Sequence, residues 1–199
     1  MTGSQRAVVL GLLLFILLYF GIMLFQLRVP ESSPTPPPPA FLLEDKAQAR
    51  RAYPIAKQEA QSWQEDAQLS SVGTVWDDLG PGGILKREHW TFEFYSPSRQ
   101  EMAVIRVKGD QAERLRTSLV PKPLVLLPLE QWRVDSTDAF KIWWERGGAK
   151  FVGQREQIAI SLKLRLMPQA RQAQWTVTGS SSGEHWVVQL ASEDGEVLQ

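Results

Sequence analysis

Two histidines offer this chain its most adaptable side-chain chemistry, and they have similar neighbours. His89 and His185 each follow a glutamate and precede a tryptophan. Two imidazoles and two carboxylates form a ligand set that zinc accepts. The sequence has no HExxH pair, phosphate-binding loop or dinucleotide fingerprint to support such a site. We therefore expect each histidine to lie exposed near the start of a strand, and we predict no metal site.

Residues 179–183 read GSSSG, which matches the letters of the nucleophile elbow of serine hydrolases. That elbow needs a strand before it, a helix after it, and acid and histidine partners further along the chain. Here a strand is predicted to follow, and the single downstream histidine lies only two residues beyond. A hairpin loop is the better interpretation.

Two pairs of aspartates complete the candidates for chemistry. Asp77 and Asp78 begin a loop rich in glycine and proline, and Asp135 and Asp138 lie at the start of a predicted helix. A turn and a helix cap explain these pairs more simply than catalysis or cation binding does. The sequence thus predicts no catalytic residue, no cofactor and no enzymatic activity. An envelope hydrolase is a further hypothesis, which requires both histidines to converge with carboxylates in a cleft.

Bulk composition excludes several classes of function. Lysine plus arginine equals aspartate plus glutamate, with 22 of each, so no excess of charge points to nucleic acid. The absence of cysteine excludes disulfides and thiolate chemistry.

Residues 7–25 read AVVLGLLLFILLYFGIMLF and carry no charge. At about 1.5 Å rise per residue, a helix of this length crosses most of a hydrocarbon core of about 30 Å. A cleaved signal peptide would have a shorter apolar region followed by small residues at the cut site, which this segment lacks. We expect a retained membrane anchor in contact with lipid. Its core residues are Leu12, Phe15, Leu18, Tyr19 and Ile22.

The orientation of the anchor follows from its flanking charges. Arg6 and the α-amino group precede the apolar segment, whereas Arg28 on the other side is soon followed by Glu31. The positive-inside bias places the short N-terminus in the cytoplasm. The larger part of the chain is therefore expected on the extracytoplasmic side of the cell membrane.

A proline-rich stretch, PESSPTPPPPAF, occupies residues 30–41. Such a chain adopts an extended polyproline helix of about 3.1 Å per residue, which would hold the following domain about 30 Å from the membrane. A ligand for an SH3-type domain is the alternative, but such ligands usually carry a basic residue beside their prolines, and Arg28 is the nearest one here. We interpret the stretch as a spacer.

The remaining residues read as a helix, strands, a linker, a second helix and more strands. The alanine spacing in residues 42–68 predicts a helix that Pro54 kinks or delays. A second helix is predicted to begin at Asp135 or Ser136 and to end at glycines 147–148. An Asp-Gly turn closes the chain. The predicted strands cover residues 69–76, 89–96, 101–108, 111–116, 157–167, 175–179 and 185–192.

The second half can be aligned on the first as a repeat. Trp90 aligns with Trp175, and Asp110 aligns with Asp194. A rival register, which matches EHWTFEFYS with EHWVVQLAS, leaves the final hairpins unmatched. The alignment predicts an α+β fold, in which a transmembrane helix precedes two repeated units that each pack one helix on an antiparallel sheet of about four strands. The predicted parts are a cytoplasmic tip and anchor at 1–28, the spacer at 29–41, a first unit at 42–119, a linker at 120–131 and a second unit at 132–199.

The closing stretch WVVQLASEDGEVL, and the order of helix, strand, hairpin and terminal strand, resemble PepSY-type modules. These modules occur in the propeptides of thermolysin-like metallopeptidases and in bacterial envelope proteins, and they are cystatin-like, with one helix wrapped by an antiparallel sheet. The resemblance covers most of residues 49–199 as two divergent copies. The first copy departs from the pattern, because it ends VKGDQAERL where the family has glycine after the acidic residue. The resemblance implies modulation of a peptidase or of an envelope complex.

Eight tryptophans, all outside the apolar N-terminal segment, are the strongest indication of a binding surface. Trp143 and Trp144 are adjacent on one predicted helix, so they point about 100° apart. Exposed aromatic side chains mark interaction sites, and we take these two as candidate partner contacts. The alternative is that one of them packs between the two units. Trp90, Trp175 and Trp186 fit the buried faces of strands.

These features predict a single-pass envelope protein that displays a protein-binding module, with its sheet edges as further contact surfaces. Its role would be accessory, inhibitory or scaffolding, with a protein partner and no nucleic acid. A second hypothesis is a small structural subunit of a multi-protein membrane complex, held by its transmembrane helix. The two hypotheses differ in whether an unrelated helix can replace residues 7–25.

Overall fold

The computed structural model describes residues 35–38, 48–77, 89–155 and 157–198. The described residues from Pro36 onward form one compact unit. No helix within the described ranges is long and apolar enough to span a membrane. The residues predicted as the core of the anchor lie outside these ranges: Leu12, Phe15, Leu18, Tyr19 and Ile22.

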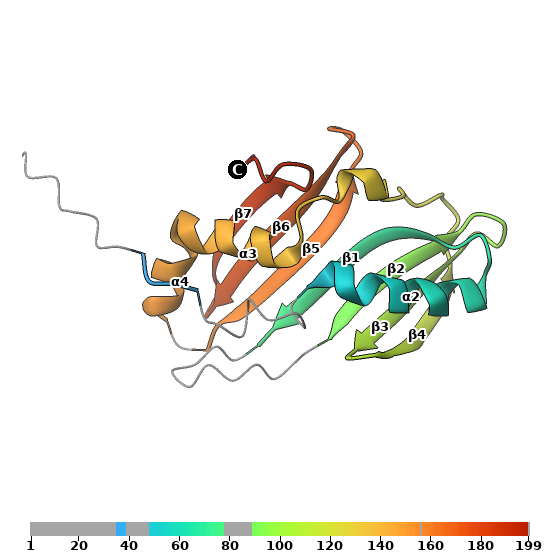
Figure 1. The fold of residues 1–199 in the computed structure, drawn as a ribbon, viewed down its shortest axis with the longest axis horizontal. Helices are drawn as coiled ribbons and strands as arrows, with labels where there is room; N and C mark the ends of the chain where they lie inside the picture. The colour runs from blue at the N-terminus through green and yellow to red at the C-terminus, as the bar shows by residue number, and fades with distance from the viewer. Residues whose placement is uncertain (1–34, 39–47, 78–88, 156, 199) are drawn as a thin grey trace, which may run out of the picture. The chain divides into compact units, whose positions relative to one another are not determined.

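Seven strands of the described residues form one antiparallel sheet with the order β4-β3-β2-β1-β5-β6-β7 (Figure 1). The hairpins of the first half lie on one side of the β1–β5 junction, and those of the second half lie on the other. The strands are β1 (Gln68–Trp76), β2 (Trp90–Ser96), β3 (Glu101–Lys108), β4 (Gln111–Leu119), β5 (Ala159–Met167), β6 (Gln172–Ser181) and β7 (Glu184–Ala191).

The β1–β5 pairing joins the two halves of the chain into a single sheet. Residues 71–76 of β1 pair with residues 160–165 of β5, while the other edge of β1 pairs with β2. The prediction of two repeated helix-on-sheet units is therefore wrong. Trp90 and Trp175, aligned above as equivalent positions, lie edge to face in one shared core, with ring centroids 6.5 Å apart. Alternation in a sequence indicates which face of a strand is buried, but it does not specify the neighbouring strand.

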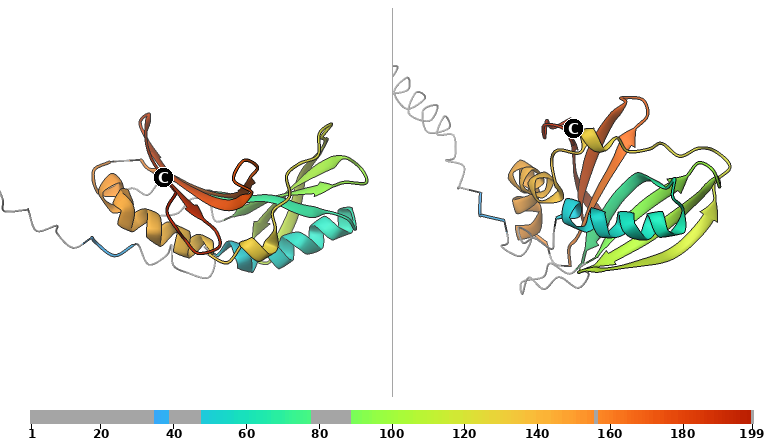
Figure 2. Two further views of the ribbon diagram at one scale, coloured as in Figure 1. Left: turned by 90° about the horizontal axis from the view of Figure 1, so that it is seen from above. Right: turned by 45° about the vertical axis from the view of Figure 1, so that its right-hand side comes forward.

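The described helices all lie on one face, the convex side of the curved sheet (Figure 2). Helix α2 (Ala49–Trp63) packs on β2, β3 and β4, and helix α3 (Ser136–Trp143) packs on β6 and β7. A short turn η3 (Leu129–Gln131) precedes α3, and a wide turn η4 (Trp144–Gly148) links it to α4 (Ala149–Gly153).

The N-termini of α2 and α3 meet at Asp135 and Ser136. The Ala49 amide donates to Ser136 Oγ (2.9 Å), and the Arg50 amide donates to Asp135 Oδ1 (3.2 Å). Asp135 Oδ1 also accepts from the Ser136 amide (2.7 Å), so it caps α3 as predicted. Two adjacent residues therefore satisfy backbone amides at the start of two helices.

Helix α2 presents small side chains to the sheet. The side chains that face the sheet include Ala52, Ala56 and Ala60, each at most 7% exposed. Pro54 lies on the exposed side of this helix, where it removes only one backbone hydrogen bond. The helix begins at Ala49, so it includes the proline instead of starting after it.

Helix α3 ends at Trp143, and the helical backbone is broken at Gly147 as predicted, but a short helix α4 follows directly. The chain winds through η4, where Gly147 has a φ of +113°, and α4 then continues to Gly153. Gly148 lies against the indole of Trp143, and an added Cβ there would overlap the ring. The glycines therefore form a kink over the Trp143 side chain.

Candidate functional site

His89 and His185 do not converge. His89 precedes β2, and its carbonyl accepts a hydrogen bond from Thr74 Oγ1 (2.7 Å). His185 is exposed in β7, with its Nδ1 3.0 Å from Ser180 Oγ. Strands β2 and β7 are four strand spacings apart, which is roughly 19 Å. Among the described residues, no group of three or more histidine, aspartate or glutamate side chains could hold a metal ion.

Residues 179–183 form the end of β6 and the turn into β7. Ser182 (φ +46°) and Gly183 (φ +85°) make the turn, and Ser181 pairs with Glu184. Because a strand follows this turn directly, the serines do not form a nucleophile elbow. Nothing in the described part of the chain positively indicates an enzyme.

The predicted aspartate pairs have structural roles where they are described. Burial raises the pKa of Asp135, against the lowering effect of the hydrogen bonds that it accepts as a helix cap. Asp138 is exposed and pairs with Lys141 at 3.5 Å. Asp77 follows β1, and Asp78 lies outside the described residues. These groups do not form a pair of carboxylates that face one substrate.

A polar hollow of about 280 Å³ lies on the face opposite the helices, across β2, β1 and β5. Ser71 Oγ donates to Glu93 Oε2, and Lys163 Nζ lies 4.0 Å from the same carboxylate oxygen. The serine thus donates to a carboxylate that is already near an ammonium group. This network neutralises its own charges, and it does not resemble an activated nucleophile.

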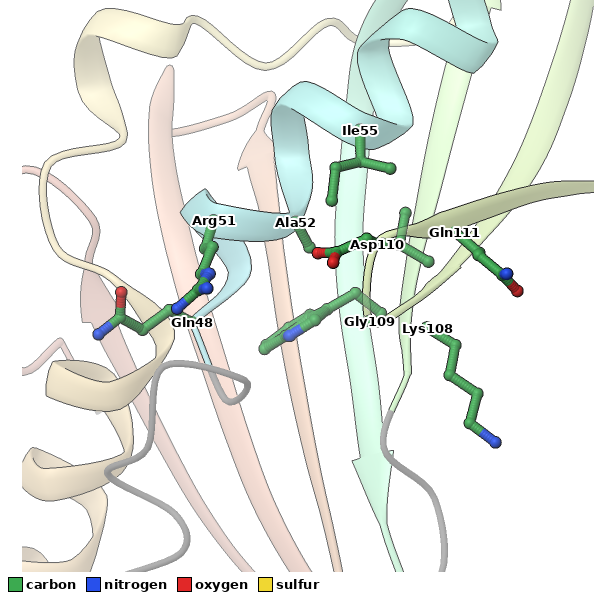
Figure 3. Close-up of a pocket in the computed structure, with 10 residues that line it drawn as sticks. Gln48, Arg51, Ala52, Ile55, Lys108, Gly109, Asp110 and Gln111 are labelled. Atoms are coloured by element: carbon green, nitrogen blue, oxygen red, sulfur yellow. The ribbon is translucent and has the colours of Figure 1, made fainter.

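A larger cavity of about 530 Å³ opens between the first turn of α2 and the β3–β4 turn (Figure 3). Ala52 and Ile55 contribute apolar walls, and Arg51, Lys108 and Asp110 contribute charged groups. Figure 3 shows the Lys108 side chain extending away from α2. The charged groups carry both signs and do not point toward one centre, so the cavity indicates no ligand class.

The predicted partner contacts Trp143 and Trp144 are buried, with exposures of 0% and 5%. Trp143 donates from Nε1 to the carbonyl of Trp186 (3.1 Å). Trp144 packs against Phe140 and donates from Nε1 to the carbonyl of Pro36 (2.6 Å). Both indoles have partners within this chain, and their role as contacts for another protein stays a prediction.

Strand β7 is one edge of the sheet, and half of that edge is already paired. Residues 196–198 return along it after a turn. The Ala191 amide donates to the Glu196 carbonyl, and the Leu198 amide donates to the Gln189 carbonyl, each at 2.8 Å. This short return segment runs antiparallel to β7.

The other half of the β7 edge has no strand beside it among the described residues. Outward-pointing backbone groups alternate along a strand. Because residues 189 and 191 point outward and the β6–β7 ladder has no register shift, the amides and carbonyls of His185 and Val187 also point outward. Trp186 and Val187 are 41% and 44% exposed. An unpaired backbone edge therefore lies between two apolar side chains.

The opposite edge, β4, has a different character. Its residues are exposed except for the half-buried Ala112, and it carries Glu113, Arg114 and Arg116. A register shift interrupts its ladder with β3 beside Val104. Charged side chains and bulges protect an edge from pairing with another strand.

Trp186 is an edge residue, which the sequence did not indicate. The prediction of buried side chains is confirmed for Trp90 and Trp175, at 4% and 0% exposure, and is wrong for Trp186, which is 41% exposed. An added Cβ on Gly147 would lie 2.7 Å from the Trp186 ring, so the ring covers the helix kink and leaves its far side exposed. Alternation within β7 could not reveal this, because it carries no information on which strand ends the sheet.

Comparison with known proteins supplies no relative. The chain matches no family model, and no curated protein or solved structure matches it. The resemblance to PepSY-type modules stays a prediction, and the case for a function rests on the geometry of this chain.

Proposed function

We propose that this chain is a membrane-anchored protein-binding module that uses the unpaired half of β7 as its contact surface. Residues 7–25 hold it at the cell membrane, with the sheet on the extracytoplasmic side. A partner protein adds an extended segment beside His185 and Val187. The module acts as an accessory, inhibitory or scaffolding protein and has no catalytic step of its own.

The outward backbone groups of β7 carry this proposal. Residues 196–198 of the chain itself pair with the same edge in an antiparallel arrangement, which supports the view that the edge accepts a strand. A further strand needs a row of alternating amides and carbonyls, and an extended polypeptide presents such a row. This requirement favours a protein segment over a small molecule.

The side chains beside this edge support an apolar contact on both faces of the added strand. Side chains alternate along a strand, so Trp186 and Val187 lie on opposite faces. Trp186 is on the helix face, over Gly147. Tryptophan is enriched among the residues that dominate binding energy at protein interfaces.

Photo-crosslinking of the full chain in its native membrane tests the proposal. A benzoylphenylalanine residue introduced at His185 should cross-link one stoichiometric protein. The same residue at Arg116, on the charged β4 edge, should not cross-link that protein. Hydrogen exchange of the isolated complex should show protection of the Val187 amide, which is the signature of an added strand.

Two substitutions at Val187 form a matched pair. Val187→Pro removes the outward N–H while leaving the β6 ladder intact, and it should lower cross-linking from position 185 about tenfold. Val187→Thr keeps the N–H and the branched shape and should retain cross-linking. Equal cross-linking from both sheet edges, or no loss with Val187→Pro, would contradict binding by strand addition.

Replacement of residues 7–25 with an unrelated apolar helix separates this proposal from the hypothesis of a subunit held by its transmembrane helix. A module that binds through β7 needs the anchor only for location, so partner cross-linking from position 185 should persist. Loss of the partner after the exchange would favour the helix-held subunit.

A further inference from the structure

The proline-rich stretch meets the body of the fold at Trp144. Residues 35–38 read Thr-Pro-Pro-Pro, and the Pro36 carbonyl accepts a hydrogen bond of 2.6 Å from Trp144 Nε1. The two residues are 108 positions apart in sequence. The bond is therefore a tertiary contact that holds the stretch against the helix layer.

Trp144 belongs to an aromatic cluster at the end of α3. Its ring centroid lies 5.8 Å from that of Phe140 and 6.5 Å from that of Trp143. Trp143 is itself fully buried and hydrogen-bonded to the Trp186 carbonyl. These neighbours hold the Trp144 ring in place, so its N–H is presented in a fixed direction with little ordering cost on binding.

The chemistry of proline makes it a suitable ligand for such a group. Consecutive prolines hold an extended polyproline helix, whose carbonyls have no internal hydrogen-bond donor. Aromatic-lined surfaces recognise this helix, because it is already ordered before it binds. The Trp144 indole N–H suits such a ligand, since neighbouring rings hold it in place and it donates to a proline carbonyl.

We propose that Trp144, held in place by Phe140 and Trp143, is a binding site for polyproline segments, which residues 36–38 of this chain occupy in cis. The ligand class is an extended proline-rich peptide, and Trp144 Nε1 is the hydrogen-bond donor that recognises it. The site lies on the helix layer, and its test does not involve the outward groups of β7. Its failure would leave the proposed function standing.

Binding of the prolines at this site shortens the free chain between the proposed anchor and the sheet. With an anchor that ends at residue 25, a free stretch up to α2 would reach at most about 80 Å. Docking at residue 36 leaves roughly ten residues, which reach at most about 36 Å. The bound prolines thus shorten the range over which the sheet can move relative to the anchor by about half.

Distances between two spin labels on the full chain in detergent test the site. The chain has no cysteine, so Thr35→Cys and Lys150→Cys supply the two labelling positions, and both residues are exposed. A docked stretch should give one narrow distance distribution. Trp144→Phe keeps an aromatic ring but removes the donor, and it should lower the ratio of docked to released stretch about fivefold.

A matched control is available at Trp132. This residue is as buried as Trp144, and its Nε1 has no hydrogen-bond partner among the described residues. Trp132→Phe therefore removes the same atoms without removing a hydrogen bond, and it should leave the distance distribution unchanged. Replacement of all three prolines at 36–38 by serine leaves the aromatic cluster intact and should broaden the distribution.

A synthetic peptide with the sequence PESSPTPPPPAF tests recognition in trans. A tethered ligand has an effective concentration in the millimolar range, so the peptide is added at about that concentration. It should broaden the distribution, whereas a peptide with serine in place of each proline should not. The site is overturned if the unsubstituted chain already gives a broad distribution, if Trp144→Phe and the serine variant both leave it narrow, or if the proline peptide has no effect.

Discussion

The molecule has two helix–sheet layers, one beneath α2 and one beneath α3. The largest side chains come from the sheet in the first layer and from the helix in the second. Beneath α2, the fully buried helix residues are alanines, and the half-buried Tyr53 packs on Phe92 and Phe94 of the sheet. Beneath α3, the helix contributes Phe140 and Trp143, and the sheet contributes Gly179, where a Cβ would lie 2.6 Å from the Trp143 ring. Each layer fills the space between a helix and the same curved sheet.

Packing therefore constrains the total side-chain volume in a layer more than it constrains whether the helix or the sheet supplies that volume. Positions that carry large residues in one layer need not correspond to such positions in the other. The match of Trp90 with Trp175, on which a repeat was predicted, joined two residues that in fact touch each other.

Truncation of the bulky partner in each layer should cause the largest losses of stability. Trp143→Ala in α3 and Phe92→Ala in β2 should each lower the free energy of unfolding by about 3–5 kcal/mol, because both side chains are 0% exposed. Ala56→Gly in α2 should cost only about 1 kcal/mol. Urea unfolding of the full chain in detergent, followed by tryptophan fluorescence, measures all three. An equal cost for Ala56→Gly would contradict the view that the large side chains carry the stability of each layer.

Substitution of Gly179, the small residue in the layer beneath α3, should have a smaller effect on stability. Gly179→Ala places a methyl group 2.6 Å from Trp143 Cζ2 and 3.0 Å from Phe151 Cε1, and it should lower the free energy of unfolding by about 1–3 kcal/mol. Gly153→Ala is the matched control, because no atom lies within 4 Å of its added Cβ. It should be neutral or slightly stabilising.

A double variant sharpens this second prediction. Trp143→Phe removes the ring atoms that an alanine at position 179 would meet, so Gly179→Ala should cost less in that background than in the unsubstituted chain. Strictly additive free energies would show that the two side chains do not share the space between α3 and β6.

The smallest predicted effect is a pair of opposite pH dependences. Asp66 accepts hydrogen bonds from Ser96 Oγ (2.6 Å) and the Ser98 amide (2.8 Å), and these lower its pKa below 3.8. Burial raises the pKa of Asp135 above 3.8. The stability that Asp66 contributes is present above pH 3.8 and is lost as the pH falls through its lowered pKa. The stability linked to Asp135 is highest below pH 3.8 and is lost as the pH rises through its raised pKa.

Asparagine variants measure these two slopes. As the pH rises from about 2.5 to 6, the deficit of Asp66→Asn relative to the unsubstituted chain should grow, and that of Asp135→Asn should shrink. Free energies of unfolding from urea titrations at each pH give both curves. Slopes of the same sign would show that burial does not dominate at Asp135.

Strand positions could be predicted from the sequence because alternation is a local property. Strand β3 (Glu101–Lys108) matches its predicted range, and the chain reverses at Gly109 as expected. Strand neighbours could not be predicted in this way. The pairing of Val72 with Leu164 joins residues from different halves, and no turn residue or spacing between them specifies it.

The candidate sites could not be predicted from the sequence either, because they also depend on contacts between distant segments. Trp143 and Trp144 are adjacent on a helix, so exposure of at least one was expected. The kink at Gly148 receives the first ring, and Pro36 accepts the hydrogen bond of the second. Both partners are recognisable only once distant segments have been placed. The exposed edge at Val187 likewise depends on β7 being the last strand of the sheet.

The shared cap at Asp135 and Ser136 has a consequence for the order in which the molecule is built on the ribosome. The residues that cap α2 follow it by 85 and 87 positions, and β5, which completes the pairing of β1, comes later still. At about 5–20 residues per second, synthesis of that interval takes roughly 4–17 s. During this time the nascent first half has an uncapped helix, and β1 has an unpaired edge on the side that later receives β5. A chaperone can bind that edge before the second half of the sheet emerges.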